Sequence, residues 1–155
     1  MGMNGRRLVR LWPHLVGTRQ PRRRLAAGVA VLVASATVGF LLGVDAARSL
    51  GWIAVAFGIA VAGGTWGAGF VPTAVTLWLV GLWWTAFPPL AGYLTGGWAP
   101  GSRYTYPRTL DYAYVSARTE LVGGIEQGIR IGLLFAIILG ASGYLVGVGV
   151  LRLRR

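Results

Sequence analysis

The polar residues that could do chemistry gather in one short segment, directly before the last apolar stretch. Asp and Glu number only four in 155 residues, yet Glu120 and Glu126 both lie here, with Gln127 and Arg130 beside them. Carboxylate, amide and guanidinium groups next to a membrane span are the groups that line the paths of ions and polar substrates. This segment is therefore the candidate site that the sequence offers.

The spacing of these residues places them on one side of a helix. At 100° per residue over 109–130, the four polar side chains fall within an arc of about 120°, and apolar residues fill the opposite arc. Glu126 precedes Arg130 by four residues, the orientation in which an ion pair stabilises a helix by about 0.2–0.5 kcal/mol. One interpretation is a solvated helix face. The other is a polar path lined by Glu120, Glu126, Gln127 and Arg130 near the membrane surface.

A stripe of glycines runs along the same segment. Gly124, Gly128 and Gly132 recur every four residues in a chain that has 25 glycines. Small residues at this spacing allow a second helix to approach closely. We expect these three glycines to be helix-packing residues, against another helix of this chain or of a second copy.

Catalytic patterns are missing from the sequence. His14 is the only histidine, there is no cysteine, and neither a zinc-protease motif nor a phosphate-binding glycine loop occurs. Asp111, Glu120 and Glu126 point in different directions on the helix, which does not suit a metal ion. We expect no catalytic residue, no cofactor and no metal site, and hence a protein that is not an enzyme.

Composition and charge indicate a membrane protein. Hydrophobic residues make up 55% of the chain and charged residues 12%, about half the usual share for a soluble domain. All 15 basic residues are arginine, which favours a prokaryotic source, and ten of them flank the apolar segments. The net charge of +11 is thereby explained by anionic lipid head groups without nucleic acid. The residues expected to contact head groups are Arg22, Arg23, Arg24, Arg152, Arg154 and Arg155.

Apolar runs divide the chain into a leader, one membrane domain and a tail. Residues 1–24 are a basic leader, residues 25–151 a single helical domain, and residues 152–155 a basic tail. The domain is predicted to hold four spans, at about 25–44, 50–64, 72–94 and 129–151, with an outer loop and amphipathic helix over 95–128. The Pro88-Pro89 pair is expected to end or kink the third span. Arginine at both ends places both termini in the cytoplasm, which an even number of spans permits.

The predicted fold is therefore an all-α integral membrane bundle of four transmembrane helices, with an amphipathic helix preceding the last span. We expect a multi-pass protein of the cell membrane without catalytic activity, acting as a packing, accessory or assembly subunit through glycine-lined faces. Its expected partners are an anionic bilayer and either further copies or a larger membrane protein. The alternative is a small transporter or channel component in which Glu120, Glu126 and Arg130 line a path.

Overall fold

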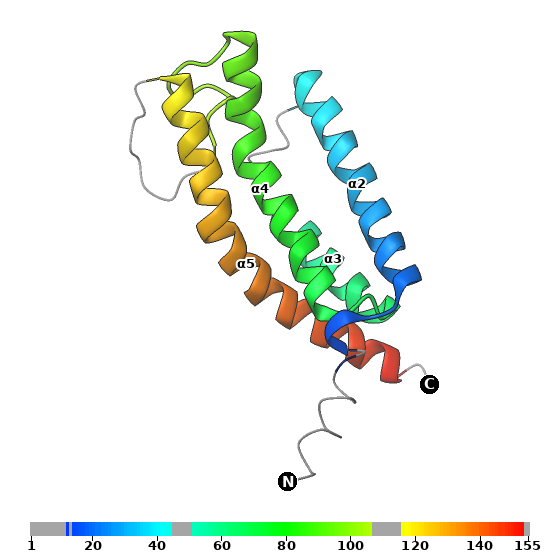
Figure 1. Cartoon of the computed structure of the whole chain (residues 1–155). Coiled ribbons are helices and arrows are strands. Elements are labelled where there is room, and N and C mark those ends of the chain that lie inside the picture. The colour runs from blue at the N-terminus through cyan, green and yellow to red at the C-terminus, as the bar shows by residue number, and fades with distance from the viewer. Residues whose placement is uncertain (1–11, 13, 45–50, 107–115, 154–155) are drawn as a thin grey trace.

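The computed structural model describes residues 12, 14–44, 51–106 and 116–153, and these residues form helices joined by short connections (Figure 1). The helices are α2 (Arg19–Leu41), α3 (Gly51–Trp66), α4 (Phe70–Thr95) and α5 (Ala117–Leu153). The all-α prediction is confirmed for the described residues. We call the end of the bundle where α4 finishes and α5 begins the loop end, and the opposite end, where α2 begins and α5 finishes, the basic end.

Three helices are long and apolar enough to cross a membrane, and α3 is shorter. The 16 residues of α3 extend about 24 Å at 1.5 Å per residue, less than a hydrocarbon core of about 30 Å. The second of the four predicted spans, at about 50–64, corresponds to α3. The helix stops at Trp66 because Gly67 and Gly69 adopt positive φ angles of 71° and 91° and turn the chain into α4.

The predicted amphipathic helix and the last span are one continuous helix. The 37 residues of α5 extend about 55 Å, which exceeds the thickness of a hydrocarbon core by more than 20 Å. The part of the predicted amphipathic helix at 109–115 lies outside the described residues. Residues 117–130 therefore extend the last span at the loop end instead of forming a separate helix.

The Pro88-Pro89 pair lies inside α4, which continues to Thr95 and ends at Gly96 in the left-handed conformation. Of the two alternatives, ending or kinking the third span, the first is wrong, and the span reaches the predicted end near residue 94. Proline lacks an N–H, so Pro89 cannot donate to the carbonyl of Thr85 four residues earlier. That carbonyl lies against Gly124 of α5. The neighbouring helix thus covers the backbone oxygen that the proline leaves without a helical donor.

Small residues on α5 form the main seam of the bundle. The buried positions recur at intervals of about four residues, and each step of four turns the stripe by about 40° around the helix. The seam therefore passes from α4, near Gly124, to α3, near Gly147, whose close neighbours are Val61, Gly64 and Thr65. The buried residues of α5 are Glu120, Gly124, Gly128, Ala136, Gly140, Gly143, Tyr144 and Gly147.

The segment before α2 is fixed across the basic end. The Tyr144 hydroxyl donates to the carbonyl oxygen of His14 at 3.1 Å, and the Thr18 amide donates to the carbonyl of Gly67 at 3.4 Å. Gly17 lies so close to Ala68 that a β-carbon would overlap its backbone. The start of α2 and the end of α5 therefore lie at the same end of the bundle, as Figure 1 shows.

Candidate functional site

Glu120 is a fully buried carboxylate at the loop end. Its relative exposure is 0%, and its Oε1 accepts a hydrogen bond from the backbone N–H of Tyr106 at 3.0 Å. Glu120 lies in the first turn of α5, where the unpaired N–H groups of a helix favour negative charge. The carboxylate thus ties the end of the loop between α4 and α5 to the start of α5.

Glu120 is also the first residue of the stripe that contains the glycines. It precedes Gly124 by four residues, and both are buried. A β-carbon on Gly128 would lie 2.5 Å from Thr85 Oγ1 and 2.8 Å from Leu82 Cδ1, whereas one on Gly132 would meet nothing nearer than 3.7 Å. Gly124 and Gly128 therefore pack directly against α4 of the same chain. At Gly132, a β-carbon would lie at an ordinary van der Waals distance from α4.

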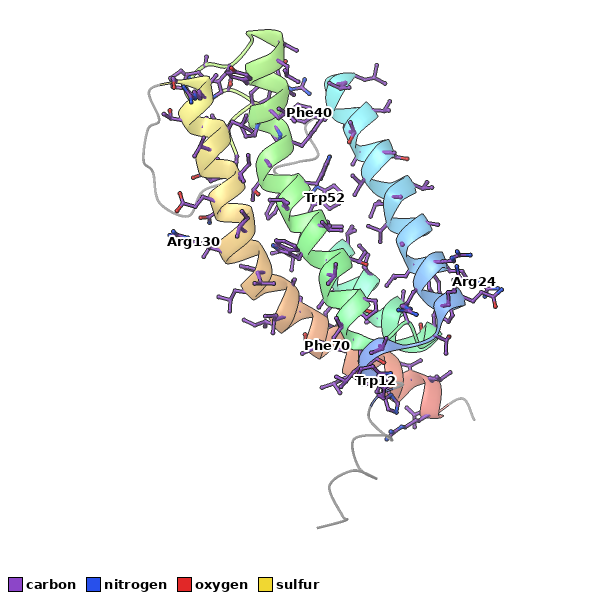
Figure 2. The ribbon with its side chains drawn as sticks, in the orientation of Figure 1. Trp12, Arg24, Phe40, Trp52, Phe70 and Arg130 are labelled. Carbon is purple, nitrogen blue, oxygen red and sulfur yellow. The ribbon has the colours of Figure 1, made fainter. Side chains whose placement is uncertain are left out.

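The other two charged residues of the predicted site face away from the bundle. Arg130 Nη2 lies 2.8 Å from Glu126 Oε1, and the side chains are 75% and 54% exposed. Figure 2 shows Arg130 pointing outward from α5. An exposed pair of this kind contributes about 0.2–1 kcal/mol. The structure brings Glu126 and Arg130 together and separates both from buried Glu120.

Gln127 faces a third direction, into an apolar groove. This groove, of about 310 Å³, lies between α3, α4 and α5. Of the four polar residues that the sequence grouped, only Gln127 lines it, together with Thr85 of α4. In the part of the chain that the structure describes, the four side chains therefore do not converge on one cavity.

An aromatic cluster at the loop end was missed by the sequence analysis. The Trp83 indole stacks on Phe87 with ring centroids 5.4 Å apart, and Phe87 meets Phe40 edge to face, also at 5.4 Å. The Arg103 guanidinium lies 4.3 Å from the centroid of the Phe40 ring, and it donates to the carbonyl oxygen of Phe40. This contact fixes the loop to the end of α2.

The pattern of the sequence gives only a weak signal for this cluster. Trp83 and Phe87 are four residues apart in one helix, which predicts that their rings meet. Arg103 and Phe40 are separated by 63 residues. Their contact therefore depends on how α2, α4 and the loop after α4 are arranged in space.

The basic residues expected at the membrane surface lie at one end of the bundle. Arg22, Arg23 and Arg24 belong to the first turns of α2, and Arg152 to the last turn of α5. Figure 2 labels Arg24 near this end. Arg154 and Arg155 lie outside the described residues. Four of the six arginines expected at the head groups therefore lie at the basic end.

Among the described residues, no three His, Cys, Asp or Glu side chains lie close enough together to hold a metal ion. No protein-family model, curated protein or solved structure matches the sequence. The structure supports a multi-pass helical membrane protein, with a loop held at one end by Glu120 and Arg103.

Proposed function

We propose that this chain is a non-catalytic accessory or assembly subunit of the cell membrane, which binds a further copy or a larger membrane protein through an exposed ridge on α5. The glycine stripe of α5 is covered by α4 over Gly124 and Gly128, so the partner surface is assigned to another face of the helix. We define the α5 ridge as Val122, Ile125 and Ile129. Their spacing of three and four residues puts them on one side of α5.

The position of the α5 ridge along the membrane normal is the observation that supports this function. Glu126 and Arg130 are both exposed, and exposed charges within hydrocarbon are expensive. That turn of α5 therefore belongs at the head groups, and Val122 and Ile125 lie at or beyond them. Val122 is 57% exposed, and Ile125 and Ile129 are also exposed. Apolar residues spaced along an exposed helix outside the hydrocarbon are the anchors by which one helix docks on another protein.

The proposed orientation has both termini in the cytoplasm and the loop end outside. The arginines of α2 and α5 gather at the basic end, and arginine is enriched on the cytoplasmic side of membrane proteins. For both ends of the chain to lie there, α3 must return the chain from the loop end to the basic end. It does so as a short helix packed against α4 and α5, although it is shorter than the hydrocarbon core.

Exchanging two ridge residues for asparagine tests the accessory role. In native membranes, the amount of complex formed by the Val122→Asn/Ile125→Asn protein is expected to be at least tenfold lower than for the unaltered protein. The reason is that polar side chains remove the apolar contact. Complex size is measured after extraction of membrane patches with a polymer that retains lipid. Mixing two differently tagged copies shows whether the partner is the same chain.

The control is Leu94→Asn, which alters a more exposed apolar residue at the loop end of α4. It should leave the complex unchanged. The function would be ruled out if the unaltered protein were a monomer without a partner in native membranes. It would also be ruled out if the double substitution left the amount of complex unchanged.

A transporter or channel component receives less support from the geometry. A path would need Glu120, Glu126 and Arg130 to face a common cavity. Instead Glu120 binds the loop, and the other two form an exposed pair. The accessory role is therefore the function that we propose.

A further inference from the structure

The short length of α3 leaves a hollow on the seam between α4 and α5. The first two turns of α3 contribute Trp52 and Ala56 to the lining of the groove, and α4 and α5 form its walls. The walls are almost wholly apolar, and Leu139 is the lining residue of α5 that lies farthest from the loop end. The groove therefore opens sideways into the hydrocarbon, along the middle of α4 and of α5.

The size of the groove decides what kind of molecule fits. Its volume is about 310 Å³. Along α5 the groove runs from Gln127 to Leu139, twelve residues or about 18 Å. One leaflet contributes about 15 Å to the hydrocarbon core, so the groove is as long as one extended lipid chain.

The lining of the groove changes from polar to apolar along its length, as a lipid does from its ester group to the end of its chain. Thr85 and Gln127 are the polar lining residues, and both lie toward the loop end. The exposed Glu126–Arg130 pair is next to Gln127 in the sequence but faces away from the bundle and does not line the groove. The deeper lining, around Ala56 and Leu139, is apolar. A phospholipid has the same order, with a polar ester followed by an apolar chain.

We propose that this groove is a binding site for one acyl chain of a phospholipid from the leaflet at the loop end. The ester group lies beside Thr85 and Gln127, and the end of the chain lies between Ala56 and Leu139. The bound lipid completes the packing that α3 is too short to supply.

Native mass spectrometry of the detergent-purified full chain tests the site. Phosphatidylethanolamine is added as the probe, and one lipid per chain is expected to stay bound. Ala56→Phe should lower the bound fraction about tenfold, because the ring occupies the end of the groove. Ala54→Phe, an exposed position on the same helix that is not part of the lining, should leave it unchanged. Equal binding by the two variants would overturn the proposal, as would no bound lipid in the unaltered protein.

Photo-crosslinking in the unaltered protein supplies a test that needs no substitution. A lipid with a diazirine at the end of its chain should label the region of Ala56 and Leu139, and one with a diazirine beside the ester should label Thr85 and Gln127. If Ala56→Phe does not fold, Ile53→Trp, which enters the groove from its exposed rim, replaces it. Labels spread evenly over the lipid-facing surface, or crosslinks from the groove to a second protein chain, would contradict a lipid site.

Discussion

Gly124→Ala is expected to destabilise the bundle by about 3 kcal/mol, the upper part of the usual range for overpacking. The added β-carbon would overlap the carbonyl oxygen of Thr85, and a backbone atom in the middle of a helix cannot move aside as a side chain can. The overlap also falls at the turn where Pro89 already removes one hydrogen bond from α4. Thermal unfolding of the purified protein in detergent measures the loss.

Gly132→Ala is the matched control for this substitution. It alters the same stripe of the same helix, but its nearest neighbour would be 3.7 Å away, which is ordinary contact. The expected change is below about 1 kcal/mol, and alanine is the better helix former of the two. Equal effects of Gly124→Ala and Gly132→Ala would show that α4 and α5 are not packed as described.

Glu120→Ala is expected to lower the free energy of unfolding by about 2–3 kcal/mol and to release the loop from α5. The substitution removes a charged acceptor from the buried N–H of Tyr106, and hydrogen bonds to charged groups contribute about 1.5–3 kcal/mol. Hydrogen exchange at the Tyr106 amide should become at least tenfold faster, because the loop opens more often.

Glu126→Ala separates this effect from a general loss of acidic charge. Glu126 makes an exposed pair with Arg130, so its removal should change stability by no more than about 0.5 kcal/mol and leave exchange at Tyr106 unaltered. A Glu120→Ala protein with unchanged exchange at Tyr106 would show that the carboxylate does not hold the loop.

Hydropathy predicts the long helices because it depends on local composition alone. The predicted spans at 25–44, 72–94 and 129–151 correspond to α2, α4 and α5 within a few residues at most boundaries. The end of α3 was placed near Gly63 or Gly64, but the helix runs to Trp66. Gly63 lies against Thr73, and Gly64 against the backbone of Tyr144. These two glycines serve close contact between helices, and only their neighbours in space reveal this.

The candidate site was harder to predict because a helical wheel contains no neighbours. It groups Glu120 with Glu126 and Arg130 by angle, but it does not show that the backbone N–H of Tyr106, 14 residues earlier in the chain, donates to Glu120. One signal was present in the sequence. Glu120 continues the four-residue spacing of the glycines, and a residue in register with a packing stripe is expected to be buried. Arg103 had no such signal, because it lies in the loop after α4 and its partner Phe40 lies in α2.

The topology of the bundle can be tested directly because the chain has no cysteine. Single cysteines are introduced at Ala99, exposed in the loop, and at Leu153, exposed at the basic end, and intact cells are treated with a membrane-impermeant maleimide. We expect Ala99→Cys to be labelled in intact cells and Leu153→Cys to be labelled only after lysis. Labelling of Leu153→Cys alone in intact cells, or recovery of both proteins in the soluble fraction, would contradict a membrane bundle with both ends in the cytoplasm.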